Sequence, residues 1–190
     1  MIKAYKKKNS FLEKSFSNSI DEKFVNKIQT LRANEKYVKI LSKYKLNIID
    51  KAIKDCVNQF LNKETEFNIK NNSLAEINSL SDDKVLDYLF HRYRYEIYPD
   101  KKLIDDYPPL VQIEPSSICN FRCVFCFMTD AKFSHKKSPH MGTMSLDSYK
   151  KIIDQIEDNV QFVTLASRGE PLVNKNLGKM LSYSKNKQFR

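Results

Sequence analysis

Glycine and proline, the residues that most often interrupt helices and strands, are missing from the first 98 residues of the chain. All three glycines and all six prolines come later. This sharp change predicts an α-helical N-terminal region, residues 1–98, followed by a segment of different architecture. At 190 residues the chain is long enough for one domain or for two small ones with cores of their own.

Apolar residues of the N-terminal region recur at the three- and four-residue intervals of amphipathic helices. The longest such run covers 41–61. A further helix is expected over 85–93, with Asp82 and Asp83 in its first turn, where the helix dipole favours acidic side chains. The polar tract 62–72 between them predicts a connection.

Four polar or sulfur-containing side chains of this region have local interpretations. Ser73 followed by Glu76 has the spacing of a capping box, which would start a helix there. Cys56 lies within a helical pattern and is predicted to be a small buried apolar residue. His91 is predicted to pack against neighbours or to lie on the surface.

The net charge of +10 is concentrated at the N-terminus, where residues 1–50 hold 12 lysines and arginines against 5 acidic residues. A basic arm of this kind can contact nucleic acid or an acidic partner. A solvated, lysine-rich helical surface explains the same charge and is favoured, because no arginine-rich patch is interleaved with aromatic residues. We therefore expect no nucleic-acid partner. No apolar run is long enough for a membrane span or a secretory signal, so we expect no membrane partner and a cytoplasmic location.

Beyond the helical region the chain alternates between strand-like and helix-like segments. Tyr98 and Tyr107 each precede a proline, which pushes them out of helical geometry and predicts a linker over 99–109. The segments that follow are expected over 110–113 (strand), 146–156 (helix, capped by Ser145), 160–165 (strand) and from 177 onward (helix). This order predicts a βαβ unit with two parallel strands and a right-handed crossover. Because parallel sheets are covered on both faces, we expect the chain to be the front part of a longer protein.

Three of the four cysteines, Cys119, Cys123 and Cys126, fall within eight residues directly after the first predicted strand. Thiolates are the usual ligands of iron–sulfur clusters. Three of them on one loop can hold three corners of a cubane and leave one iron open to a ligand that is not protein. An open coordination position is what distinguishes a catalytic metal centre from a structural one.

Two other interpretations of the cysteines stay open. Positions i, i+4 and i+7 also line one face of a helix, so the thiols could be core residues. Against this, the preceding segment 114–117 reads Glu-Pro-Ser-Ser, which is typical of a loop. The alternative metal is zinc, with His135 or His140 as the fourth ligand, although paired Cys-x2-Cys spacings are more usual for zinc.

The spacing Cys-x3-Cys-x2-Cys resembles the signature of the radical S-adenosylmethionine (SAM) superfamily. The turn Arg168-Gly169-Glu170 after the second strand, with Pro171-Leu172 behind it, is similar to the Gly-Gly-Glu turn that grips the methionyl amino group of SAM in that family. Phe125, just before the third cysteine, matches the aromatic residue that lies next to the adenine. The resemblance covers residues 110 to about 185.

The chemistry of this turn suits the role that the resemblance implies. A carboxylate and turn carbonyls favour an ammonium group, and glycine lets the backbone come close. Arg168 replaces the first glycine of the family pattern and is expected either to alter this grip or to reach the carboxylate of SAM. The simpler alternatives are an exposed turn that only follows a strand, and phenylalanines (Phe121, Phe125 and Phe127) that only pack the cysteine loop away from water.

The resemblance implies a [4Fe–4S] cluster on Cys119, Cys123 and Cys126 and SAM as the second cofactor. It implies an enzyme, an oxidoreductase or a transferase, that reductively cleaves SAM to a 5′-deoxyadenosyl radical for hydrogen abstraction. The substrate, a peptide, sugar or small molecule, stays unknown, and an electron donor such as flavodoxin or ferredoxin is expected. The implied fold is α/β, an incomplete (β/α) barrel of the radical SAM type (a partial TIM barrel) whose first two βα units occupy 110–190.

Two other functions remain as alternatives. The first is a non-catalytic zinc-binding module whose basic arm contacts nucleic acid. The second is an inactive fragment that binds SAM weakly, because later barrel strands are missing.

Overall fold

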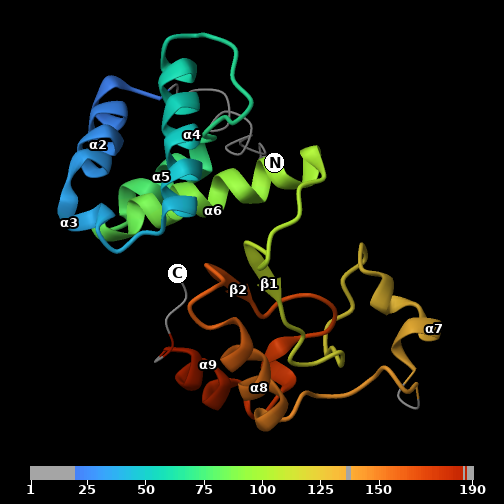
Figure 1. The fold of residues 1–190 in the computed structure, drawn as a ribbon. Helices are drawn as coiled ribbons and strands as arrows, with labels where there is room; N and C mark the ends of the chain where they lie inside the picture. The colour runs from blue at the N-terminus through green and yellow to red at the C-terminus, as the bar shows by residue number, and fades with distance from the viewer. Residues whose placement is uncertain (1–19, 136–137, 186, 188–190) are drawn as a thin grey trace, which may run out of the picture. The chain divides into compact units, whose positions relative to one another are not determined.

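The computed structural model describes residues 20–135, 138–185 and 187 (Figure 1). They divide into two compact units, one ending at Ile104 and one starting at Asp105. Residues 1–19 of the predicted basic arm lie outside the described part of the chain. None of the described helices is both long enough and apolar enough to cross a membrane.

In the first unit, helices are the only regular structure among residues 20–104, as the absence of glycine and proline predicts. Its helices are α2 (Glu22–Ala33), α3 (Glu35–Val38), α4 (Lys43–Phe60), α5 (Asn71–Ser79) and α6 (Asp82–Lys101). The Ser42 side chain caps α4 by accepting a hydrogen bond from the Lys45 backbone N–H at 3.2 Å. Asp82 and Asp83 occupy the first turn of α6, as predicted.

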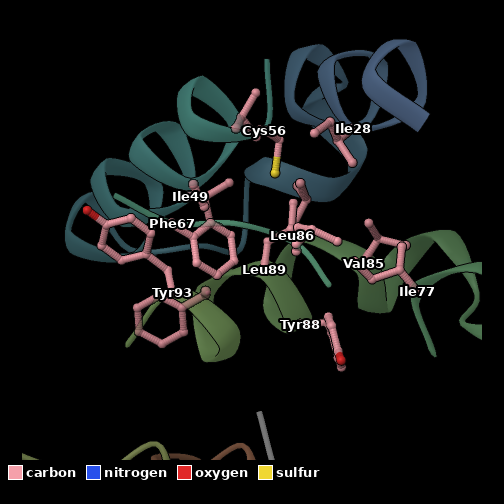
Figure 2. Packing of buried hydrophobic residues seen from close by; sticks show 14 of the residues in the cluster. Ile28, Ile49, Cys56, Phe67, Ile77, Val85, Leu86, Tyr88, Leu89 and Tyr93 are labelled. Atoms are coloured by element: carbon pink, nitrogen blue, oxygen red, sulfur yellow. The ribbon is translucent and has the colours of Figure 1, made fainter. Parts of the chain in front are cut away.

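The core of this unit forms where α2, α4 and α6 bring their apolar stripes together (Figure 2). Ile28, Ile49 and Leu89 are fully buried there. Cys56 is also fully buried, which confirms the prediction of a core residue. Burial disfavours the thiolate and raises the pKa of Cys56 to about 12, with a further contribution from the charge of Asp55.

The connection between α4 and α5 is more than a polar loop. Phe67 and Ile69 are buried, and the Phe67 ring lies 5.5 Å from the Tyr93 ring of α6. The Gln59 side chain accepts the Ile69 N–H at 2.9 Å and donates to the Ile69 carbonyl at 3.0 Å. Asp55 accepts the Phe67 N–H at 3.2 Å. The segment is therefore fixed by side chains of α4.

The surroundings of Tyr88 show why the predicted capping box is wrong. Ser73 and Glu76 both lie inside α5 and hydrogen-bond the Tyr88 hydroxyl instead of capping a helix start. The hydrogen bonds of these two side chains are therefore directed to the buried Tyr88 phenol and not to the backbone at the start of a helix. On the next turn of α6, His91 packs between the Tyr88 and Tyr95 rings, with centroid distances of 6.4 and 5.8 Å.

Helix α6 continues through Pro99 and stops at Lys102, which adopts the left-handed conformation with φ of 54°. Leu103 N–H donates to the Tyr98 carbonyl at 2.9 Å and closes the helix end. The predicted linker 99–109 thus starts too early, since its first three residues are helical. Burial of Ile97 in the core holds the last turns in place against the local preference before proline.

The second unit has α/β architecture. Its elements are β1 (Leu110–Gln112), η1 (Phe127–Thr129), α7 (Ala131–Ser134), α8 (Leu146–Ile156), β2 (Phe162–Thr164), η2 (Pro171–Val173) and α9 (Leu177–Lys185). The two strands pair in parallel, with Val111 opposite Val163, which confirms the predicted pairing. Within the described residues the sheet has two strands, so the structure shows an α/β segment and not a closed barrel.

Helix α8 joins the two strands and covers them. Ser145 caps it as predicted, accepting the Ser148 N–H at 3.1 Å. Tyr149 and Ile153 of α8 and Met180 of α9 are buried together with Ile113, which directly follows β1. This small core fixes the carboxyl ends of both strands, and the loops that carry the predicted site residues leave from these ends.

Candidate cofactor site

The three clustered cysteines lie on an irregular loop between β1 and η1. All three are free thiols; Cys123 is exposed, and Cys119 and Cys126 are partly buried. Phe121 N–H donates to the Cys119 sulfur at 3.3 Å, and Cys126 N–H donates to the Cys123 carbonyl at 2.9 Å. The alternative of a buried helix face is wrong, because no helix runs through these positions.

The donor set of this loop fits an iron–sulfur cluster by its chemistry, since three free thiols are offered within eight residues. The thiols do not yet converge: among residues 20–135, 138–185 and 187, no three histidine, cysteine or carboxylate side chains form a group that could hold a metal ion. Ordering of a ligand loop and binding of its metal are commonly coupled. The loop therefore has the ligands of such a centre but not its closed geometry.

The two histidines considered for zinc do not join the thiols. His135 is exposed, and the His140 ring bonds the Ser138 hydroxyl, with Nδ1 at 2.9 Å from Oγ. Both residues flank a short gap in the described chain, at residues 136–137. The described contacts thus give the zinc alternative no fourth ligand.

The phenylalanines of the cysteine loop point into solvent. Phe125 is 88% exposed, and Phe121 and Phe127 are each more than half exposed. The expectation that these rings shield the loop from water is therefore wrong for the structure. Phe127 meets the Phe133 ring edge-on at 5.5 Å. Phe125 is left accessible to a planar ligand.

A small cavity of about 230 Å³ opens beside the first cysteine. Its walls come from the cysteine loop, η1, α7 and the segment before α8, namely Ile118, Cys119, Arg122, Met128, Ser134 and Met141. The Arg122 guanidinium is turned back onto its own loop, where it donates to the Phe121 carbonyl at 2.9 Å.

The turn after β2 docks on the backbone that leads into the cysteine loop. Gly169 has φ of +76°, and a Cβ at this position would stand 2.1 Å from the Ser116 carbonyl oxygen. Glu170 N–H donates to the Ile118 carbonyl at 2.9 Å. The Glu170 carboxylate accepts the Leu172 N–H at 3.0 Å and caps η2. Two motifs that are fifty residues apart in the chain are thus brought into backbone contact.

Arg168 of the same turn is engaged by protein groups. Its Nη2 lies 2.9 Å from Glu114 Oε1, and its Nε lies 3.2 and 3.3 Å from the two carboxylate oxygens. Nη2 also donates to the His140 carbonyl at 3.1 Å. The Arg168 and Glu114 side chains are 26% and 27% exposed, so the pair is largely shielded from water.

Comparison with known proteins identifies this region. The model of the radical SAM superfamily matches residues 113–189, which include the three clustered cysteines and the turn. Residues 113–189 are therefore similar to the radical SAM superfamily, and this part of the chain is called the radical SAM segment from here on. A curated relative, the GTP 3',8-cyclase of Desulforamulus reducens, is 30% identical over 79 residues, which are 40% of this chain and 23% of the relative. The chain thus spans less than a quarter of that relative's length. No solved structure matches the chain.

Asn174 links distant parts of the radical SAM segment through its side-chain amide, and no sequence pattern predicted this role. It is buried, and its Nδ2 donates to the Pro115 carbonyl at 2.7 Å and to the Met144 carbonyl at 2.9 Å. Its Oδ1 accepts the Asn176 N–H at 2.9 Å. The only sequence signal was an asparagine shortly before a helix, which predicts a local cap and not a link to two distant segments.

Ser117 supports the same backbone from the other side. Its hydroxyl accepts the Gly142 N–H at 2.7 Å, and its own N–H donates to the Gly142 carbonyl at 3.0 Å. Ser116 forms an antiparallel bridge with Thr143. The approach to Cys119 in the radical SAM segment is therefore held between the segment before α8 and the turn after β2.

Proposed function

We propose that this chain is part of a radical SAM enzyme, in which Cys119, Cys123 and Cys126 hold a [4Fe–4S] cluster. The single observation that carries the proposal is the contact of the Gly169–Glu170 turn with the backbone directly before Cys119. It places the proposed cofactor turn beside the proposed cluster loop. The superfamily match over residues 113–189 supports the same assignment.

In this proposal different residues of the chain bind different parts of SAM. The thiolates of Cys119, Cys123 and Cys126 would hold the cluster, and SAM would bind at its remaining open position through its amino and carboxylate groups. The Glu170 carboxylate and the turn carbonyls face the ammonium group, for which a negative partner is favourable. Phe125, exposed at the loop tip, stacks on the adenine. When bound and reduced, the cluster supplies one electron for the cleavage of SAM and so starts hydrogen abstraction.

In this proposal the cysteine loop would close around the cluster that its three thiolates hold. The exposed Cys123 thiol, the partly buried thiols of Cys119 and Cys126 and the exposed phenylalanine rings are consistent with a loop that would reach its final geometry only with the metal bound. The turn and the backbone of 116–118, in contrast, are already connected by hydrogen bonds. In this proposal the turn at 168–170 and the backbone of 116–118 therefore position the cysteine loop, which would become ordered when the cluster binds.

The reaction class in this proposal is oxidoreductase or transferase, with a substrate among peptides, sugars and small molecules. A flavodoxin or a ferredoxin is proposed as the electron donor in a reducing cytoplasm. Because the chain spans 23% of its curated relative, substrate recognition is assigned to parts of the enzyme beyond this segment.

Anaerobic reconstitution of the purified chain with iron and sulfide tests the proposal. We expect a brown protein whose reduced cluster gives an electron paramagnetic resonance (EPR) spectrum that changes when SAM is added in excess. Single Cys→Ser variants at 119, 123 and 126 should each lose the cluster. Cys56→Ala, which removes the remaining thiol from the helical unit, is the matched control and should retain it.

Two results would contradict the proposal. One is a colourless protein that binds one zinc ion per chain through the same thiols. The other is a cluster that persists when any of the three loop cysteines is replaced. A cluster that forms but gives no response to SAM would support cluster binding and would place productive SAM binding outside this segment.

A further inference from the structure

We infer that Arg168 is a positioning residue, which anchors the turn after β2 to the segment leading into the cysteine loop through Glu114, and that its guanidinium does not contact SAM. The inference rests on the proposed function for the role of the turn. The anchoring itself is a property of the metal-free chain.

Three consecutive turn residues meet three alternate residues of the segment after β1. Arg168 binds the Glu114 carboxylate, Gly169 touches the Ser116 backbone, and Glu170 N–H donates to the Ile118 carbonyl. The three contacts fall on residues 114, 116 and 118, so one short segment receives the whole turn. The ion pair forms one end of this row, and the first cysteine directly follows the other.

The Arg168 contact is built for fixed geometry. A guanidinium is a planar fork that matches a carboxylate at two points, and here two of its nitrogens engage Glu114. Its additional bond to the His140 carbonyl joins the segment before α8 to the same group. A single side chain therefore links three loops that are far apart in sequence.

Charge balance argues against a direct contact with SAM. The Glu114 carboxylate neutralises Arg168, and both side chains are about three-quarters shielded from water. Turning the Nε–Nη2 edge of the guanidinium towards the carboxylate of a ligand would leave Glu114 as a shielded, uncompensated charge, which is unfavourable. The protein partner is therefore the favoured one.

Hydrogen exchange in the metal-free chain tests the anchoring. In Arg168→Met the Glu170 amide, which bonds the Ile118 carbonyl, should exchange about tenfold faster or more, on the order expected for loss of a charge-assisted hydrogen bond. Arg168→Lys should give a smaller increase, and Glu114→Gln, which is nearly isosteric, a smaller increase in the same direction. Lys175→Met is the matched control, because it removes an exposed cation near the turn.

A charge swap distinguishes positioning from direct contact. Glu114→Arg combined with Arg168→Glu should restore most of the slow exchange at Glu170 and the SAM-dependent change in the EPR spectrum. Slow exchange that is restored without the SAM response would overturn the inference, because it would show that Arg168 itself meets SAM. Unchanged Glu170 exchange in Arg168→Met would overturn it as well.

The two experiments distinguish an error in the proposed function from an error in the role of Arg168. If the wild-type chain binds no cluster, the EPR experiment fails for every variant, while the exchange rates still report whether Arg168 anchors the turn. Faster exchange confined to the turn and to 116–118 supports the anchoring, and equally faster exchange throughout α8 and α9 contradicts a local role.

Discussion

Gly169 and Ser116 are in backbone contact, so close that a Cβ on Gly169 would stand 2.1 Å from the Ser116 carbonyl oxygen and 2.8 Å from the Ser116 carbonyl carbon. The atoms opposite are backbone, so they cannot move aside as a flexible side chain would. The φ of +76° adds a second restriction, since residues with a Cβ rarely adopt it. The turn and the approach to Cys119 can come together only if this residue is glycine.

Replacing Gly169 by alanine should therefore separate the turn from the segment 116–118. We expect a loss of at least about 1–3 kcal/mol in the free energy of unfolding, the usual cost of a strained backbone, and a weaker response of the cluster to SAM. Denaturant unfolding measures the first effect. The control is Gly178→Ala on α9, where nothing lies within 4 Å of the added carbon and helix propensity should make the change neutral or stabilising.

Asn174→Ala tests the buried amide that links 115, 144 and 176. It removes the side-chain donor to the Met144 carbonyl and one of two donors to the Pro115 carbonyl, which keeps the Met144 N–H. The substitution should destabilise the radical SAM segment by about 1–3 kcal/mol in urea unfolding. Asn176→Ala is the control, because Asn176 takes part in this network through its backbone N–H alone. Equal unfolding midpoints for the two variants would show that the amide network carries no stability.

Ile49→Ala tests the core of the helical unit. Ile49 is fully buried in α4, so its truncation should cost about 2–5 kcal/mol through lost burial and a residual cavity. Ile40→Ala is the same chemical change at a residue that is 74% exposed, and it should cost less than about 0.5 kcal/mol. A small effect at Ile49 would contradict the packing of α2, α4 and α6 around it.

Thiol labelling of the metal-free chain separates the four cysteines by accessibility. Under native, reducing conditions Cys119, Cys123 and Cys126 should react with an alkylating reagent, and Cys56 should react only after unfolding. Peptide mass spectrometry identifies the labelled positions. Rapid native labelling of Cys56 would contradict its place in the core.

The helical unit should become less stable at high pH. Burial raises the pKa of Cys56 from 9.0 to about 12, and burial together with the Glu76 contact raises that of Tyr88 from 10.0 to about 12. An unfolded chain ionises these groups first, so their contribution is complete below about pH 9 and is lost as the pH rises towards 12. Cys56→Ala and Tyr88→Phe should each flatten this decline in urea unfolding. Parallel curves for variants and wild type would contradict the assignment.

Strong local patterns made much of this architecture predictable. Helices α4 and α6 follow from apolar spacing, and the parallel pairing of β1 with β2 follows from a strand–helix–strand order. The cysteine spacing and the turn at 168–170 led to the superfamily that the match over 113–189 bears out. In each of these cases the signal is a local pattern or the order of elements, and general rules of helix formation and strand connection lead from it to the structure.

The partners of individual polar side chains in distant segments were the part that sequence could not reveal. Asn174 reaches Pro115 and Met144, and Arg168 reaches Glu114, across 30 to 59 residues. The capping box failed for the same reason, since Ser73 bonds a phenol of another helix. A local pattern states which bonds a polar side chain can make, but the fold decides which partner is within reach.

The hydrogen bonds of the Gln59 side chain determine which substitutions the connection between α4 and α5 can tolerate. A single amide serves both the N–H and the carbonyl of Ile69, and therefore recognises main chain, whatever side chain is attached there. Neighbouring exposed positions such as Lys63 and Glu64 should therefore tolerate substitutions and insertions. Glutamate at position 59, in contrast, would lose one of the two hydrogen bonds to Ile69. This single substitution on α4 should therefore destabilise the connection more than several substitutions at its exposed positions.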